Sequence, residues 1–243
     1  MPKDKLIRHI AYLIGIFILS FFSFFRVFET YELQTLDLRF KLRPPLTVSP
    51  DIVIIEIDET SIKELGRWPF NREYHAYLID CLRQLGARAI VFDIIFGDEN
   101  PEDKEQDKAL IEATEKANGL VYYPIVLEID ERSRKGFTEA SEIEVPLIQG
   151  LAKSAKGVGF INAVADIDGK IRRVPLTIDC KGKKYYHLTS LVAKDYLHKE
   201  FVKVPLGDDG MAIINYPGKW NSTFKRYSFS DVLKSYVQTV DGE

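Results

Sequence analysis

Apolar and polar positions divide the chain into an N-terminal apolar segment followed by a region in which strand and helix patterns alternate. Residues 10–25 contain no charged side chain, and flanking apolar residues bring the segment close to the ~20 residues that span a bilayer. The segment lacks the polar face of a buried core helix and the small-residue cleavage site of a signal peptide. It therefore predicts an uncleaved transmembrane helix.

Charged residues around this segment predict its orientation. Three basic residues lie between positions 3 and 8, whereas the arginine at position 26 is balanced by two glutamates close behind it. Because excess positive charge stays on the cytoplasmic side of a membrane, we expect the N-terminus in the cytoplasm and the rest of the chain outside. The predicted localisation is the inner (cell) membrane, crossed once, with the main domain on its periplasmic side.

A second helix is expected directly after the membrane segment. Residues 29–43 contain neither glycine nor proline, and Asp37 and Lys41 have the four-residue spacing of an ion pair on one helix face. Pro44 and Pro45 end this pattern. The chain thus divides into a cytoplasmic N-terminus with the transmembrane helix (1–28), a juxtamembrane signalling helix (29–45) and an extracytoplasmic domain (46–240).

The main domain opens with a strand, helix and strand unit. Residues 52–57 form a short, β-branched apolar run, which is typical of a strand covered on both faces. Asn71 can cap a following helix whose apolar residues recur at three and four positions up to Gly86. A second apolar run at residues 89–92 completes the unit, which predicts a right-handed parallel crossover.

The second half of the domain has a different pattern. Asp166-Ile167-Asp168-Gly169 is a turn signal between strand-like segments at 158–164 and 171–179, and predicts a hairpin. The polar residues 128–144 fit a loop or an exposed hairpin. The fold class is therefore α/β, with a mixed sheet, parallel in its first half and antiparallel in its second, flanked by helices. Further helices are expected within 101–118, 145–153 and 188–197 and from 229, and further strands at 120–127, 157–164 and 211–216.

Composition and charge exclude some classes of function. The chain has 243 residues, enough for one large domain or two small ones, and its 33 basic against 36 acidic residues do not indicate a nucleic-acid partner. Nucleophile-elbow, phosphate-loop and dinucleotide fingerprints do not occur, so we expect no cofactor. Cys81 and Cys180 are interpreted as free, inert thiols, with a disulfide as the alternative.

Aspartates follow three of the predicted strands. Asp58, Asp93 and either Asp166 or Asp168 lie at strand ends, the edge where sites gather in open α/β sheets. Converging carboxylates could bind a divalent cation or act in acid–base chemistry. The simpler interpretation is that each aspartate caps a helix or forms a turn, as Asp58 can for a short helix at 60–65.

Arginine beside tryptophan forms a second candidate group. The Arg67-Trp68-Pro69 and Arg172-Arg173 strings could line a pocket for an anionic ligand, because guanidinium groups match carboxylates and phosphates, and Arg72 is a further candidate. Alternatively, Trp68 fills the core with Phe70, while Arg67 and Arg72 pair with the strand-end aspartates. The residues alone leave both alternatives open.

The order of several short motifs resembles the type-two CHASE domain, a sensory extracellular module. The similarity covers about residues 31–235, and the strings that carry it follow one another at plausible spacing. They are DLRF at 37–40, VIIEIDETS at 53–61, LGRWP at 65–69, GARAIVFDIIF at 86–96, GFIN at 159–162, the turn at 166–169, RRVPL at 172–176 and YPG at 216–218.

This resemblance implies a bacterial-type receptor with an extracytoplasmic sensor and a cytoplasmic output. The output in such receptors is a histidine kinase, a nucleotide or diguanylate cyclase or a protein kinase, and we expect it to lie outside this chain. We expect a non-enzymatic, membrane-anchored homodimer that binds an unknown small molecule or senses a physical cue. The alternative is a metal-dependent extracytoplasmic enzyme that uses Asp58, Asp93 and Asp168. The candidate ligand-binding residues are Asp58, Arg67, Trp68, Arg72, Asp93, Asp168 and Arg172.

Overall fold

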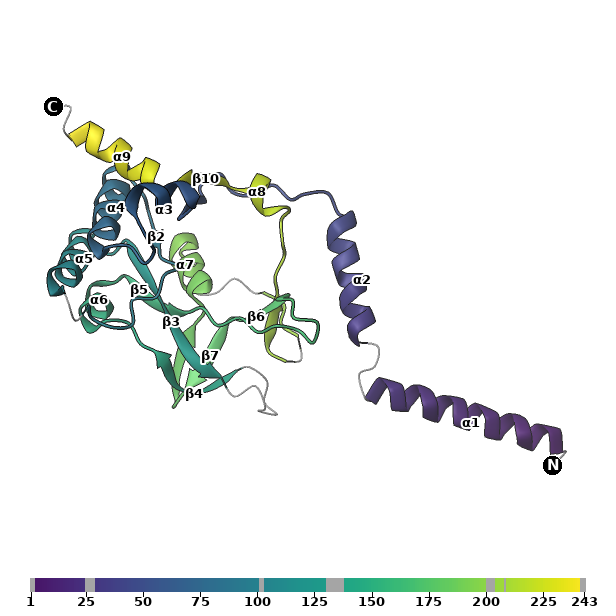
Figure 1. Cartoon of the computed structure of the whole chain (residues 1–243). Coiled ribbons are helices and arrows are strands. Elements are labelled where there is room, and N and C mark those ends of the chain that lie inside the picture. The colour runs from purple at the N-terminus through teal and green to yellow at the C-terminus, as the bar shows by residue number, and fades with distance from the viewer. Residues whose placement is uncertain are drawn as a thin grey trace.

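A six-stranded mixed sheet forms the centre of the main body (Figure 1). The structure is a computed structural model that describes residues 3–24, 29–100, 103–129, 138–199, 204–207 and 209–240. The central strand, β3 (Val121–Ile129), pairs in parallel with β2 (Ile90–Val91) and with β5 (Gly157–Phe160). These three strands form the parallel part of the sheet that the sequence predicts.

The remaining strands continue the sheet with two antiparallel pairs and one parallel pair, so the second half of the sheet is not purely antiparallel as expected. β4 (Glu139–Val145) runs antiparallel to the end of β3, so the exposed-hairpin alternative for this region is confirmed for the described residues. β4 pairs in parallel with β7 (Thr177–Cys180), and β7 pairs antiparallel with β8 (Lys183–Tyr186). The predicted α/β class with a mixed sheet is confirmed.

Helices cover both faces of this sheet. The Tyr122 hydroxyl donates a hydrogen bond of 2.7 Å to Asp195 of α7 (Leu188–Leu197), whereas the Tyr123 hydroxyl lies 2.7 Å from that of Thr114 on α5 (Lys104–Lys116). Because neighbouring residues of a strand point to opposite faces, α7 and α5 cover different sides of β3. The predicted helices at 101–118 and 188–197 are both confirmed.

The main core lies between the sheet and α4 (Arg72–Gln84), α5 and α6 (Gln149–Ser154). The predicted cap of α4 is present, since the Glu73 N–H donates to the Asn71 side chain over 2.8 Å. The predicted apolar stripe is only partly buried, because Tyr77 and Leu85 are exposed. Side chains in this core with at most 1% exposure are Ile79, Leu110, Val121, Tyr123, Leu127, Leu151, Phe160 and Ile178.

The first strand does not join this sheet, which corrects the predicted crossover. β1 (Val53–Glu56) pairs in parallel with β10 (Lys225–Ser228) as a separate two-stranded sheet. Val53 is 47% exposed, so the apolar run is not a strand covered on both faces. The partner strand lies far along the chain, after α8 (Trp220–Thr223), and local periodicity carries no information about such pairing.

A second, smaller core joins this strand pair to the helices. Phe70, Leu78, Phe229 and Leu233 are buried together, connecting α4 to α9 (Phe229–Val240), whose start agrees with the predicted position. The short helix α3 (Glu59–Leu65) packs against α9 as well. Both cysteines are buried and free, as the sequence predicts.

The expected hairpin around residues 166–169 is also corrected. The turn itself is present, with Gly169 at a φ of +78° and its N–H donating to the Asp166 carbonyl over 2.8 Å. The flanking segments, however, share only the bridge between Val164 and Arg173. β6 (Arg173–Pro175) pairs instead with β9 (Met211–Ile213), which is antiparallel to it and provides partners for its backbone hydrogen bonds.

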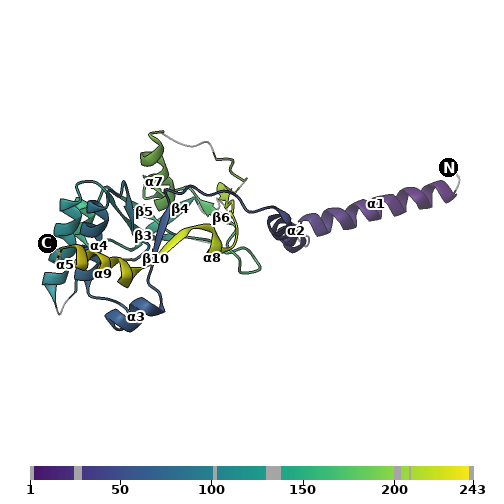
Figure 2. The ribbon, with the colours of Figure 1, turned by 90° about the horizontal axis from the view of Figure 1, so that it is seen from above.

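Two helices precede the body, and both views show the first of them extending away from it while the second lies between the first and the body (Figures 1 and 2). These are α1 (Lys3–Phe24) and α2 (Glu29–Leu42), and the predicted helix after the apolar segment is thereby confirmed. Among the described residues, no helix is both long and apolar enough to cross a membrane. The transmembrane helix expected within residues 1–28 is therefore not supported by the described part of the chain.

Candidate functional site

A buried arginine joins α2 to the body. Arg172 is 3% exposed, and its guanidinium donates to Asp37 of α2 through Nε (2.7 Å) and Nη2 (2.9 Å). It also donates to Asp166 through Nη1 (2.8 Å) and to Asp168 through Nη1 (2.8 Å) and Nη2 (2.6 Å). A buried cation is tolerated when carboxylates satisfy its donors in this way, so three aspartates from two segments form one site with Arg172.

The turn before β6 positions two of these carboxylates. Its left-handed residue, Gly169, turns the chain back so that the Asp166 N–H donates to the Lys170 carbonyl over 2.8 Å. The Arg172 carbonyl accepts from the Ile214 N–H, also over 2.8 Å, which fixes the arginine beside β9. The turn and the strand pairing together place Asp166, Asp168 and Arg172 next to one another.

Further charges extend this site, which we name the Arg172 cluster: Asp37, Asp166, Asp168, Lys170, Arg172, Arg173 and Asp209. Lys170 Nζ lies 2.6 Å from Asp37. Arg173 pairs with Asp166 over 2.5 Å and also with Asp209. The cluster therefore alternates charge from α2 to the loop before β9, and all its members have partners of opposite charge.

The hydrogen bonds of this cluster stabilise its ionised form. Arg172 and then Lys170 hold the pKa of the Asp37 carboxyl far below its usual range, and Arg172 lowers the pKa of Asp168 to about 2. Hydrogen bonds to Asp168 and Asp37 raise the pKa of Arg172 in turn. Asp37 and Asp168 therefore stay charged over the whole physiological range of pH.

A second contact between α2 and the body lies at the C-terminal end of the helix. Arg43 donates to the Asn215 side chain over 2.6 Å and to the Tyr216 carbonyl over 2.5 Å. The Phe40 and Tyr216 rings meet edge to face, with their centroids 6.4 Å apart. Since α2 contributes no buried residue, ion pairs and hydrogen bonds carry most of its attachment.

Asp58 caps a helix, which is the simpler of the two roles that the sequence suggested for it. It is the N-cap of α3, where its carboxylate accepts from the Ser61 N–H (2.8 Å) and hydroxyl (2.7 Å). The Ser228 hydroxyl donates to the same oxygen over 2.9 Å. The bonds from Ser61 lower the pKa of Asp58, as expected for a capping carboxylate.

Arg72, Arg67 and Trp68 do not form one site. Arg72 pairs with Asp107 of α5 and donates to the Asp98 carbonyl over 2.7 Å, so the suggested pairing with Asp58 or Asp93 is wrong for this residue. Arg67 is exposed and forms no ion pair among the described residues. Trp68 is 39% exposed and contacts the buried Phe70 ring, with centroids 5.3 Å apart, so it only partly fills the core.

The strand-end aspartates do not converge on a metal site. Asp58 is bound by serines, Asp168 is bound by Arg172, and Asp93 is exposed. Within the described parts of the chain, no group of three or more histidine, cysteine, aspartate or glutamate side chains is arranged to hold a metal ion. The metal-dependent enzyme therefore has no geometric support from these aspartates.

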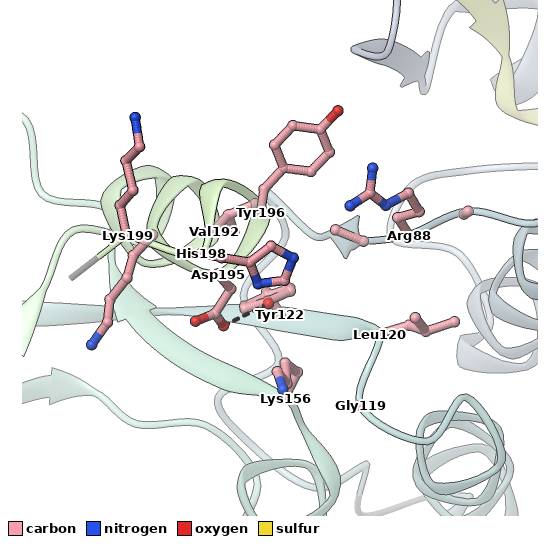
Figure 3. Close-up of a pocket in the computed structure, with 13 residues that line it drawn as sticks. Arg88, Gly119, Leu120, Tyr122, Lys156, Val192, Asp195, Tyr196, His198 and Lys199 are labelled. Carbon is pink, nitrogen blue, oxygen red and sulfur yellow. Dashed lines mark hydrogen bonds between the residues drawn. The ribbon is translucent and has the colours of Figure 1, made fainter. Parts of the chain in front are cut away.

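A cavity of about 590 Å³ lies elsewhere, at the beginnings of β2, β3 and β5 (Figure 3). The C-terminal half of α7 closes one side of it. None of the seven predicted ligand-binding residues lines this cavity. Its charged lining residues include Arg88, Lys156 and Asp195. The sequence indicated none of them as a ligand-binding residue, although Arg88 belongs to the GARAIVFDIIF string.

The sequence also missed three members of the Arg172 cluster, namely Asp37, Lys170 and Asp209. Asp37 fitted a helical pair with Lys41, whereas the structure pairs it with Lys170 and Arg172. Asp209 lies in a polar loop with no motif around it. The only sequence signal for the cluster is the density of aspartate and arginine in residues 166–173, which does not identify partners elsewhere in the chain.

The fold and the cluster define an α/β domain coupled to the helix that precedes it. The family model of the CHASE2 domain matches residues 11–243, and the chain therefore belongs to the CHASE2 domain family. The resemblance found in the sequence is confirmed. CHASE2 domains are extracytoplasmic sensors, which supports a sensor role for this chain. Searches of curated proteins and of solved structures found no match.

Proposed function

We propose that this chain is the input domain of a membrane-bound receptor. It binds a small ligand or responds to a physical cue, and passes a conformational change through α2 to a cytoplasmic kinase or cyclase. Membership of a sensor-domain family supports the input role. The observation that carries the relay is the Arg172 cluster, in which a buried guanidinium of the body is bound by Asp37 of α2.

The chemistry of this contact suits a helix that changes position. α2 has no buried apolar face, so its movement exposes no core, whereas a lost ion pair at Arg172 changes the local charge balance. A ligand shifts such an equilibrium only by its different affinities for the two states. Couplings of about 1–3 kcal/mol are typical, which matches the scale of a few charge-assisted hydrogen bonds.

We further propose that the N-terminal segment attaches the chain to the inner membrane in a single pass, with the body outside the cytoplasm. The apolar side chains of α1 are exposed, as shown by Tyr12 and Phe17 at 70% and Leu19 at 64%. Such a surface is unfavourable in water and favourable in lipid. The basic residues before it support a cytoplasmic N-terminus. A homodimer is part of this proposal, because a single helix can signal by moving against its copy.

The predicted ligand-binding residues take different places in this proposal. Asp168 and Arg172 belong to the relay, and Asp58 and Arg72 stabilise the body through their capping and ion-pair contacts. Arg67 and Trp68 are exposed, and a ligand contact there stays a prediction. The same holds for Asp93, whose carboxylate is exposed at the end of β2.

The membrane topology provides the first test of this proposal. Reporters that are active only outside the cytoplasm, fused after residue 30 and after residue 243, should both be active. A fusion before residue 3 should be inactive and is the control. A cytoplasmic location for either of the first two fusions would contradict the proposed extracytoplasmic input domain.

A further inference from the structure

We infer that the cavity between β2, β3, β5 and α7 binds a small organic or inorganic anion through phosphate or carboxylate groups. This inference deepens the proposed sensor function, on which it rests, by naming the class of ligand. The volume of about 590 Å³ lies in the range of small-molecule sites. Among the described residues, those that line this cavity enclose enough volume for a small molecule and carry more positive than negative charge.

The parallel strands build one wall of this cavity. β2, β3 and β5 begin at the same edge of the sheet, since Ile90 is paired with Val121 and Tyr122 with Gly157. The segments just before these strands therefore lie side by side, and they carry Arg88 and Lys156. Two cations from separate turns are thus brought to one sheet edge.

The second wall is the C-terminal half of α7. Gly157 and Gly159 let the helix approach β5 closely, because a Cβ at Gly159 would lie 2.6 Å from the Leu188 Cα. Asp195 is fixed on this wall by the hydroxyl of Tyr122 (Figure 3). Both walls are therefore held by the fold itself rather than by a bound molecule.

The charge of the lining is strongly positive. Four side chains, Arg88, Lys156, Lys194 and Lys199, are cationic, and Asp195 is the carboxylate that opposes them. At the rim, Asp51 accepts from the Tyr196 hydroxyl over 2.8 Å. The chain as a whole has a net charge of −3, so this concentration of positive charge does not reflect its composition.

Of the cations Arg88, Lys156 and Lys199, Arg88 has a carboxylate near it, Asp51, whose pKa is lowered by the Tyr196 hydroxyl and also by the charge of Arg88. Arg88, Lys156 and Lys199 form no ion pair with any residue that the structure describes, although the Arg88 guanidinium lies 4.7 Å from the centroid of the Tyr196 ring. Arg172 and Arg173, in contrast, are paired. The end of α7 contributes only about half a negative elementary charge, which Lys156 and Lys199 alone exceed. An anion would supply the missing charge.

Arg88 and Lys156 lie on different sides of the cavity (Figure 3). Figure 3 shows Arg88, His198 and Lys156 around the Tyr122–Asp195 pair, drawn from three different segments. The guanidinium of Arg88 offers a planar fork and the ammonium of Lys156 a point charge, and both suit phosphate or carboxylate oxygens. The Tyr196 ring beside Arg88 adds an apolar surface for the body of an organic ligand.

Calorimetric titration of the full chain tests the inference. Sodium pyrophosphate and sodium citrate are the probes, at an ionic strength held constant with sodium chloride. We expect saturable binding of at least one of them. Binding of pyrophosphate indicates recognition of phosphate groups, and binding of citrate indicates recognition of carboxylate groups. The double variant Arg88→Gln with Lys156→Gln should weaken the binding at least about ten-fold, since each residue gives a charge-assisted hydrogen bond.

A matched control removes the same charge elsewhere. Lys63 and Lys225 are exposed and lie outside the cavity lining, so Lys63→Gln with Lys225→Gln should leave the affinity unchanged. Asp195→Asn should tighten binding about five-fold, because a repulsive charge is lost while Tyr122 keeps an acceptor. This gain cannot arise from misfolding.

Three results would overturn the anion site. They are the absence of saturable binding of both probes, an equal loss of affinity in the control variant, and a loss of affinity in Asp195→Asn. The topology reporters do not depend on the cavity. If neither probe binds but both reporters are outside the cytoplasm, only the ligand class is rejected. If a probe binds but a reporter is in the cytoplasm, the proposed placement of the sensor domain is rejected.

Discussion

At the scale of single residues, His75 shows how burial controls a titratable group. Its ring is 1% exposed and meets the rings of Phe92, Phe96 and Phe229 edge to face at 5.3 to 6.0 Å. Its Nδ1 has no hydrogen-bond partner within the described residues. Burial, together with the charge of Arg72, lowers the pKa of His75 to about 4. The neutral ring is therefore the form that the folded protein accepts.

This pKa predicts loss of stability in mild acid. The unfolded chain takes up a proton at His75 near pH 6.5, whereas the folded protein does so only near pH 4. The neutral His75 ring contributes about 3 kcal/mol to the free energy of unfolding. This contribution is complete above pH 6.5 and is lost as the pH falls toward 4. Urea unfolding at pH 7.0, 6.0 and 5.0 measures this slope in the free energy of unfolding.

The variant His75→Leu should flatten the slope. A smaller one remains, because burial also lowers the pKa of His187. His198→Gln, at an exposed histidine, is the control and should keep the wild-type slope. An unchanged slope in His75→Leu would show that His75 does not govern the response to acid.

At the scale of elements, α7 depends on glycine for its position. A Cβ at Gly159 of β5 would come within 2.6 Å of the Leu188 Cα and 2.9 Å of the Tyr186 carbonyl oxygen. These are backbone atoms, so they cannot rotate away as a side chain can. The helix must move if any larger residue is present, and α7 forms one wall of the cavity.

Gly159→Ala should therefore destabilise the domain by about 1–3 kcal/mol, as is usual for overpacking. Thermal unfolding followed by circular dichroism gives the change. Gly15→Ala is the matched control, because a Cβ there meets no atom within 4 Å. Wild-type stability of Gly159→Ala would mean that α7 and β5 are not in close contact.

At the scale of the whole molecule, α2 and the body are held together by charge rather than by a shared core. The Arg172 cluster and the contacts of Arg43 make this junction, and α2 itself buries no side chain. A helix of 14 residues is only marginally stable in water without tertiary contacts. Loss of the junction should therefore free α2 before the body unfolds.

Asp37→Asn tests this junction. The variant keeps Asp166 and Asp168 on Arg172, so the body should retain its unfolding midpoint. The attachment of α2 should weaken by about 1–2 kcal/mol. Amide hydrogen exchange in residues 31–42 should therefore become about ten-fold faster. Glu32→Gln, an exposed acid on the same helix, should leave exchange unchanged. Equal exchange in the two variants would argue against a relay through Asp37.

The sequence by itself determined the local features of this protein. The caps at Asp58 and Asn71, the helix at 188–197 and the turn ended by Gly169 all follow from contacts between residues close in the chain. Hydrogen-bond periodicity and turn geometry act over a few residues, so the pattern records them directly. The family was evident for a related reason, since its motifs are short strings in a set order.

Only the tertiary structure decided which distant segments meet. The pairing of β1 with β10, the binding of Arg172 by Asp37 and the gathering of cations beside α7 all join residues far apart in the chain. Many aspartates could pair with a given arginine, and the choice depends on burial and chain closure, which periodicity does not encode. The candidate sites arise from such long-range contacts, and so the sequence indicated the sensor family while only the structure brought the residues of these sites together.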